Sequence, residues 1–197
     1  MKNIIFSLAI IAISITACNS NNQKSGDNGN NMGKDTAVIQ QPVQTSTAQV
    51  TAVVSIKEIV NGYLQVKNAL TKDNTNDAAT AATSLQATFK SFDNTALTAD
   101  QKKVFEDIAA DGGEHAEHIG KNGGNIAHQR EHFEMLSKDI TDLLKTFGNG
   151  GQILYKDFCP MYNDNKGAFW ISETKDIKNP YLGKAMPTCG TMKEEIK

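Results

Sequence analysis

One glycine-rich break constrains the fold of this chain more than any other feature. Residues 120–125, with the sequence GKNGGN, separate two apolar patterns that both recur with helical period. The first pattern comprises Val104, Phe105, Ile108 and Ile119, and the second comprises Phe133, Leu136, Ile140, Leu143, Leu144 and Phe147. Because glycines end helices and permit tight turns, the sequence predicts two antiparallel helices joined by a short turn.

All four histidines of the chain flank this break. His115 and His118 precede it, and His128 and His132 follow it. The predicted turn brings the four imidazoles to the same end of the helix pair. His128 and His132 lie on one helical face, about 6 Å from each other. Neutral imidazole is a common ligand of zinc, copper, iron and nickel, so the cluster predicts a metal site.

Structural interpretations of the same histidines stay open. His115 shares a helical face with Phe105 and Ile119 and is equally suited to packing in a core. His128 points away from the apolar stripe and needs only solvent. A histidine beside a helix C-terminus is favoured by the macrodipole, which accounts for His118 without a metal.

Residues 1–18 have the order of features of an export signal. Lys2 is followed by an apolar run from Ile4 to Ile15, too short to span a bilayer, and then by small residues before Cys18. This order resembles the bacterial lipoprotein signal, in which the cysteine is acylated, so Cys18 is predicted to anchor the protein to a membrane. An ordinary cleavable signal peptide is the alternative. Asn19, by the familiar enterobacterial sorting rule, implies a cell-envelope location in the outer membrane, facing the periplasm.

Residues 19–50 are dominated by Asn, Gln, Ser, Gly and Thr and predict a disordered polar linker. The net charge of −2 and the lack of basic runs argue against nucleic acid as a partner.

The next region, residues 51–151, predicts a helical bundle. Capping boxes at residues 55–58 and 98–101 indicate two helix starts. An alanine-rich helix is expected over residues 76–92, and a fourth helix is expected from a cap at Asn125 to about Phe147. Four amphipathic helices with short connections predict a mainly α fold, an antiparallel four-helix up-down bundle.

Residues 152–197 have a different character and predict a small appendage. Residues 153–158 and 167–172 are rich in β-branched and aromatic side chains, and residues 163–167 resemble a hairpin turn. Because so short a segment cannot support its own core, it is expected to pack on the bundle. Trp170, Phe169 and Tyr181 are the predicted anchors.

The appendage also holds two cysteines, Cys159 and Cys189, close in sequence to Met161 and Met186. Exported cysteines usually pair, so a Cys159–Cys189 disulfide is one prediction. Soft thiolate and thioether ligands select Cu(I), so a copper site of these four residues is the other.

Two stretches resemble the family called domain of unknown function 3347. They are HQREHFEMLSKDI at residues 128–140 and FCPMYNDNKGAFWISETKDIKNPYLGKAMPTCGTM at residues 158–192, and the resemblance extends from Val53 to Lys197. The matching residues are Arg130, His132, Phe133, Ser137, Cys159, Pro160, Met161, Trp170, Ser172, Asn179, Pro180, Tyr181, Gly183, Met186, Cys189 and Gly190. That family includes exported bacterial proteins, some joined to heavy-metal efflux subunits. The resemblance implies copper or a related metal, with zinc as an alternative, and efflux components as partners.

Two further patterns bear on function. The cysteine motifs resemble a short heavy-metal-binding module, from which this chain departs because Tyr162 stands where the module has histidine. Residues 128–132 satisfy the pattern H-x-x-E-H of inverted zinc proteases, with Glu131 as the base and Glu173, Glu194 or Glu195 as a third ligand. A motif without its structural context is weak, so the sequence predicts a metal-binding accessory protein rather than an enzyme. A structural or protein-binding lipoprotein without metal is the main alternative.

Overall fold

The computed structural model describes residues 47–197, with side-chain surroundings from Ile56 onward. The predicted signal peptide, the predicted acylation site Cys18 and residues 19–46 of the predicted linker lie outside this part of the chain. Across residues 47–197, no helix combines the length and the apolar character that a membrane span needs.

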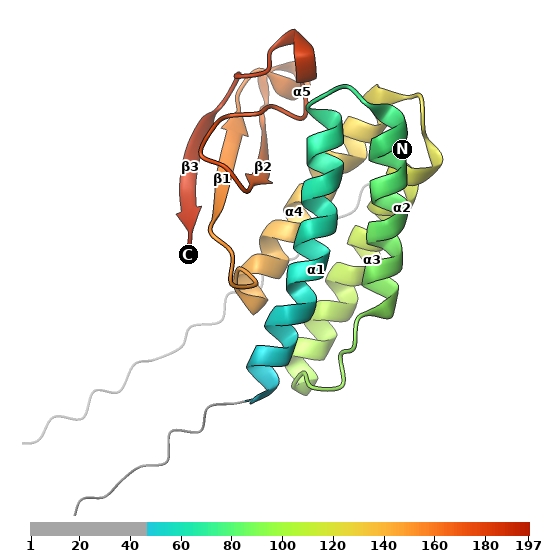
Figure 1. Ribbon diagram of the computed structural model, residues 1–197, viewed down its shortest axis with the longest axis vertical. Helices are drawn as coiled ribbons and strands as arrows, with labels where there is room; N and C mark the ends of the chain where they lie inside the picture. The colour runs from blue at the N-terminus through green and yellow to red at the C-terminus, as the bar shows by residue number, and fades with distance from the viewer. Residues whose placement is uncertain (1–46) are drawn as a thin grey trace, which may run out of the picture. The chain divides into compact units, whose positions relative to one another are not determined.

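Four long helices form most of the described chain: α1 (Thr47–Leu70), α2 (Thr75–Ser91), α3 (Ala99–Lys121) and α4 (Ile126–Phe147) (Figure 1). α1 contacts α2 and α4, and α3 also contacts both α2 and α4. Their apolar faces meet in one core that includes Ile59, Leu85, Phe133 and Leu136. The prediction of a mainly helical fold with four long helices is confirmed.

Two of the three predicted helix caps are present, and a third helix has a cap that was not predicted. The Thr98 side chain accepts a hydrogen bond from the Gln101 N–H at the start of α3, and Asn125 accepts from the His128 N–H at the start of α4. Asn74 caps α2 in the same way. The predicted start at residues 55–58 is wrong: α1 begins at Thr47 and includes residues 47–50, which the sequence assigned to the linker. Residues 47–54 contain neither glycine nor proline, so nothing in them stops the helix.

A three-stranded antiparallel sheet follows the helices. β1 (Leu154–Cys159) lies between β2 (Ala168–Ser172) and β3 (Thr191–Ile196). The β1–β2 hairpin matches the prediction, and its connection contains the single turn α5 (Tyr162–Asn165) with Asn163 and Asp164 at positive φ. β3 was not predicted from the sequence. It follows the short 3₁₀ turn η1 (Gly183–Ala185) and is mostly exposed.

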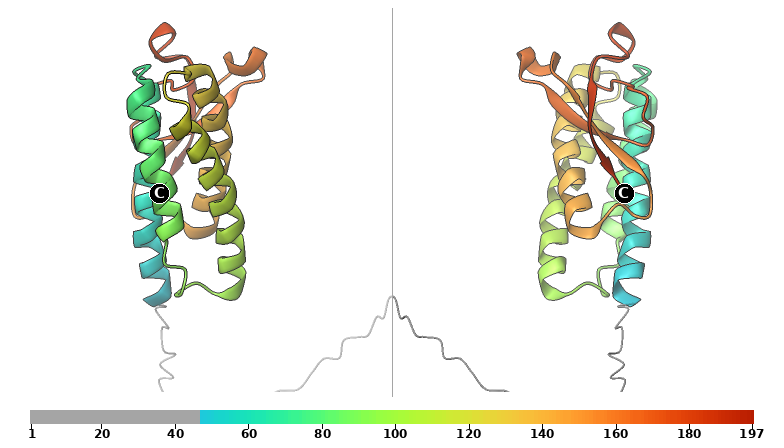
Figure 2. Two further views of the ribbon diagram at one scale, coloured as in Figure 1. Left: turned by 90° about the vertical axis from the view of Figure 1, so that its right-hand side faces the viewer. Right: turned by 90° about the vertical axis from the view of Figure 1, so that its left-hand side faces the viewer.

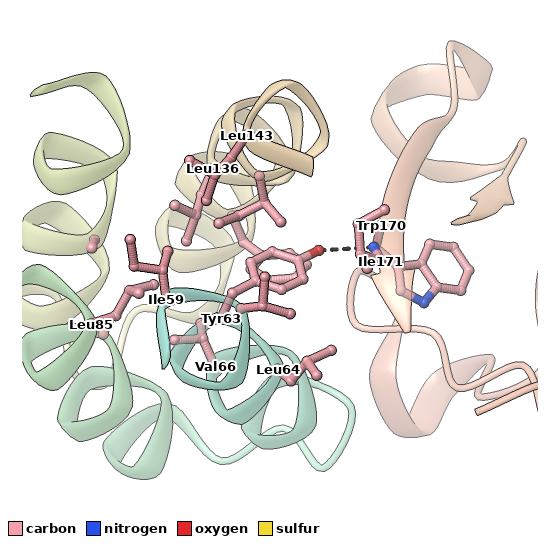
Figure 3. Close-up of a cluster of buried hydrophobic side chains, with 14 of the residues drawn as sticks. Ile59, Tyr63, Leu64, Val66, Leu85, Leu136, Leu143, Trp170 and Ile171 are labelled. Atoms are coloured by element: carbon pink, nitrogen blue, oxygen red, sulfur yellow. Dashed lines mark hydrogen bonds between the residues drawn. The ribbon is translucent and has the colours of Figure 1, made fainter. Parts of the chain in front are cut away.

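The sheet lies beside α1 and α4, on the side away from α2 and α3 (Figures 1 and 2). Tyr63 of α1 joins the two layers, because its hydroxyl accepts a 3.0 Å hydrogen bond from the Ile171 N–H of β2 (Figure 3). Trp170 and Tyr181 are buried, as expected of anchors. Phe169 was also predicted to be an anchor, but its side chain is 43% exposed because neighbouring strand residues face opposite sides of the sheet.

Candidate metal centre

The four histidines lie at the junction of α3 and α4. His115 and His118 belong to the C-terminal part of α3, and His128 and His132 belong to the N-terminal part of α4. The junction itself is held by polar side chains. Asn122 donates a 2.8 Å hydrogen bond to the His118 carbonyl, and Asn125 caps the next helix. These bonds fix how the two helices present their imidazoles.

A buried glutamine gives the junction a second tie. Gln129 has no exposed surface, and its Nε2 donates to the carbonyls of Ile119 at 3.1 Å and Thr75 at 2.9 Å. Ile119 lies in the last turn of α3, where carbonyls lack partners within the helix, and Thr75 is the first residue of α2. Gln129 therefore connects the end of α3 and the beginning of α2 to the first turn of α4, next to His128.

Three of the histidines lie close enough together to be candidate ligands of one metal ion. His118, His128 and His132 each offer a ring nitrogen, and these three nitrogens lie within 4.8 Å of one another. The rings of His118 and His132 stack at a centroid distance of 4.2 Å, and those of His128 and His132 meet edge-on at 4.5 Å. Ligand nitrogens around a tetrahedral zinc ion are about 3.4 Å apart, given zinc–nitrogen bonds of about 2.0–2.1 Å. Closing the group around an ion thus needs side-chain movements on the order of 1 Å.

The fourth histidine contacts this group from the side. The Nδ1 atoms of His115 and His132 are 3.3 Å apart. His115 Nε2 lies 3.9 Å from Asp139 Oδ2, and both side chains are 18% exposed. His115 is therefore neither fully packed in the core nor part of the three-nitrogen group. It lies between that group and the carboxylate of Asp139.

The environment favours the neutral imidazole of His132 and of His115. Burial, followed by the charges of His118, His128 and His115, lowers the pKa of His132 to about 4. Burial also lowers the pKa of His115. A metal ligand must be the neutral ring, so His132 stays competent to bind an ion in mildly acidic solution. Burial and the charges of Asp111 and Asp142 raise the pKa of Asp139 to about 7.

Two of the three carboxylates considered for a protease-like third ligand, Glu173 and Glu195, lie in other contacts. Glu173 forms an ion pair with the buried Lys67 at 2.5 Å and accepts a hydrogen bond from Asn68 at 2.9 Å. Glu195 pairs with lysines of the tail. Glu131, the base of the H-x-x-E-H pattern, is 70% exposed at its side chain and lies 3.7 Å from His128 Nδ1. The structure thus groups His128 and His132 with His118, and with none of these carboxylates.

The cysteines form a second, separate pair. Their sulfur atoms are 3.0 Å apart, with Cys159 buried and Cys189 partly exposed. The hydrogen bond between the two thiols and then burial raise the pKa of the Cys189 thiol, which a hydrogen bond with the Met161 backbone opposes. The side chains of Met161 and Met186 are 50% and 38% exposed. Within the residues whose side chains are described, no three-ligand group joins a cysteine to the histidines.

Several residues of this region escaped the sequence-based prediction. Gln129 and Asp139 were not singled out, because a polar residue on a helix gives no sign of burial by itself. The resemblance did mark Arg130, and the structure gives it a scaffold role. Its guanidinium donates to the carbonyls of Pro180 and Leu70 and pairs with Asp73 at 2.5 Å. Arg130 therefore fastens the tail to the helix that carries His128 and His132.

Comparison with known proteins adds one match. The family model described as "Protein of unknown function (DUF3347)" matches residues 59–152, and this match supports the family assignment. It begins within α1, covers α2, α3 and α4 with the histidine cluster, and ends before β1, so it includes the first of the two stretches that carry the resemblance and not the second, cysteine-containing one. Neither the curated proteins nor the solved structures contain a match to the chain.

Proposed function

We propose that this protein is a metal-binding accessory protein whose histidines His118, His128 and His132 hold one copper or zinc ion. The observation that carries the proposal is the approach of three imidazole nitrogens to within 4.8 Å of one another on two capped helices. Imidazole is a borderline ligand that suits divalent copper and zinc. Three protein ligands leave a fourth position for water or for a donor from another molecule.

An open position and half-exposed ligands suit an ion that is passed on. The side chains of His118 and His128 are 44% and 32% exposed, so a partner can reach the ion. We propose binding rather than catalysis, because the exposed Glu131 lies beside a ligand instead of facing the grouped nitrogens from a fixed position. A zinc hydrolase of the H-x-x-E-H type is the less favoured alternative.

The cysteine pair supports a second candidate activity. Sulfur atoms 3.0 Å apart, with two exposed methionines nearby in sequence, suit either a Cys159–Cys189 disulfide or a Cu(I) ion held by Cys159, Met161, Met186 and Cys189. A cysteine pair of this kind can serve as a disulfide when empty and as thiolates when loaded. The purely structural alternative keeps the disulfide and binds no metal.

The biological setting is also a proposal, and the sequence alone supports it. Acylation of Cys18 would attach the protein to the outer membrane of the cell envelope, facing the periplasm, where heavy-metal efflux components are the proposed partners. The four helices are proposed to run up and down in chain order, since their connections are short.

Metal analysis of the purified full chain tests the proposal. The protein is incubated in parallel with Cu(I), Cu(II), Zn(II) and buffer alone, then freed of unbound metal. We expect about one tightly held divalent ion per chain, since the three nitrogens form one group. Metal contents equal to the buffer control in every sample would leave the structural alternative standing.

A further inference from the structure

Asp139 is the one carboxylate beside the histidine cluster that has no use within the fold. Its Oδ2 is buried and makes no hydrogen bond among the described residues. A buried, unsatisfied acceptor lowers stability by about 1–3 kcal/mol. Ordinary packing gives no reason to keep an aspartate here, on α4 between exposed Lys138 and buried Ile140. His115 Nε2 lies 3.9 Å from Asp139 Oδ2 and could donate to it after a small movement.

The tautomers of His115 and His132 are coupled. With their Nδ1 atoms 3.3 Å apart, a hydrogen bond between them needs a proton on one Nδ1 and a lone pair on the other. In the free protein either ring can be the donor. Both tautomeric arrangements satisfy the pair, so the apo state does not fix the positions of the protons.

A metal ion on His132 removes that freedom. Because Nδ1 of His132 faces His115, the nitrogen available to the ion is Nε2. A neutral ring bound through Nε2 carries its only proton on Nδ1, so His132 must donate to His115. His115 then accepts at Nδ1 and carries its own proton on Nε2, the atom that faces Asp139. Each proton position follows from the one before it, and no proton is gained or lost.

We infer that His115 and Asp139 are positioning residues of the metal centre, and that metal binding closes a hydrogen-bonded line from His132 through His115 to Asp139. This inference rests on the proposed function of the three-histidine group. A carboxylate that orients a ligating histidine raises the basicity of the ligand and fixes its ring, and its loss weakens metal binding by about 10–100-fold. Here the carboxylate acts through a second histidine.

The gap of 3.9 Å between His115 Nε2 and Asp139 Oδ2 is longer than a hydrogen bond, so a small side-chain movement is needed to close it. In the absence of an ion the two tautomers compete, and only one of them presents an N–H group to Asp139. Once the ion selects that tautomer, the Nε2–H···Oδ2 contact becomes favourable and satisfies the buried oxygen. Asp139 therefore lowers the folding stability of the metal-free protein and raises its affinity for the metal ion.

Two substitutions of Asp139 separate positioning from packing. Asp139→Leu removes the acceptor, and Asp139→Asn keeps a neutral carbonyl acceptor. The matched control is Asp111→Asn, which removes an exposed carboxylate of α3 that acts on Asp139 only through its charge. Zn(II) affinity of each full-length protein is measured by competition with a chelator. We expect affinity to fall about 10–100-fold for Asp139→Leu, less for Asp139→Asn, and about 2-fold or less for the control.

A nitrogen-resolved NMR spectrum of the imidazoles gives the second readout. In the Zn(II)-loaded wild type we expect His132 as the Nδ1–H tautomer and His115 as the Nε2–H tautomer, whereas in the metal-free wild type we expect mixed tautomers at both rings. Wild-type affinity in Asp139→Leu, or the Nδ1–H tautomer at His115 in the loaded wild type, would overturn the inference while leaving the metal site in place. A wild type that binds no Zn(II) would instead overturn the proposed function, and the inference with it.

Discussion

The two candidate metal sites of this protein, the three-histidine group and the cysteine pair, are held by different kinds of structure. The histidines belong to two helices joined by one tight turn, with capping and glutamine hydrogen bonds on both sides of it. The cysteines join β1 to the residues just before the edge strand β3, and Cys159 is fully buried. The first site depends on local structure, and the second depends on how the tail closes on itself.

This difference teaches what each site can do without its ion. The helix junction presents its imidazoles whether or not a metal is present, because caps and core packing hold both helices. The cysteine pair has an alternative to a metal, since two thiols 3.0 Å apart can lose two electrons and form a disulfide. The affinity for divalent metal should therefore not depend on the redox state of the solution, whereas the oxidation state of the cysteine pair should change with it.

The largest expected effect comes from the ligands of the histidine group. Replacing His132 or His118 with Ala should weaken Zn(II) binding by about 1000-fold, or about 4 kcal/mol, because one of three ligands is lost. The Cys159→Ser/Cys189→Ser double variant should bind Zn(II) as the wild type does. Glu106→Gln, which changes an exposed carboxylate of α3 whose ion-pair partner is Lys102, is the matched surface control and should change the affinity less than 2-fold. A loss of Zn(II) binding in the cysteine variant would mean that the two sites are one.

A somewhat smaller effect is expected from the cysteine pair under oxidising conditions. Closing the loop between Cys159 and Cys189 should stabilise the folded protein by about 3.5 kcal/mol in the chain-entropy model. Chemical denaturation with and without reductant measures this difference, and the double serine variant should not respond to reductant. Two free thiols per chain in the oxidised protein would contradict the disulfide.

Asp139→Asn should raise the stability of the metal-free protein by about 1–3 kcal/mol at pH 8, by removing a buried unsatisfied charge. The pKa of Asp139 is raised to about 7, so the folded state holds a proton there that the unfolded state releases near pH 4. Stability from this group is therefore lost as the pH rises towards 7 and above. We expect the gain from Asp139→Asn to be small at pH 5 and full at pH 8.

His132 gives the folding stability a pH dependence of the opposite sign. Its folded-state pKa of about 4 lies below the ordinary value of 6.5, so its contribution to stability is lost as the pH falls through that range. Since both proteins keep His132, the difference between their denaturation curves isolates Asp139. A gain of equal size at pH 5 and pH 8 would show that charge burial is not its cause.

The smallest effect separates the two interpretations of the cysteine pair. If the reduced pair holds Cu(I), Met161→Leu and Met186→Leu should each weaken Cu(I) binding about tenfold, or about 1.4 kcal/mol. Their stability should change little, because leucine is close to methionine in volume. A Cu(I) competition titration measures the affinities. Equal affinities for the wild type and both variants would remove the methionines from the site.

Much of the fold was predictable because its signals are local. Thr98 with Gln101, Asn125 and the glycines after Phe147 mark helix ends through hydrogen bonds to nearby backbone groups. The prediction of the start of α1 is wrong for the same reason. The capping pattern at Ser55 begins a helix only where the residues before it are not helical. Half of the residues of β3 are charged and most are exposed, and the segment becomes a strand only by pairing with β1. No local sequence pattern predicts that pairing.

The candidate site divides in the same way. Helical spacing and one turn suffice to bring the imidazoles of His118, His128 and His132 together. The position of His115 depends on the rotation of α3 against α4, and both a core and a ligand position fitted its pattern. Asp139 could not be recognised, since only the packed helices show that its oxygen is buried and faces His115.

Cobalt substitution tests the central claim most directly, because it reports both whether an ion binds and which ligands hold it. The reduced full-length protein is titrated with Co(II) and its absorption spectrum is recorded. We predict one Co(II) per chain with visible bands of a nitrogen-rich site and no thiolate-to-metal band in the near ultraviolet, and loss of these bands in a protein lacking His118, His128 and His132. A thiolate band, or no Co(II) bound by the wild type, would contradict a divalent metal centre built from these three histidines.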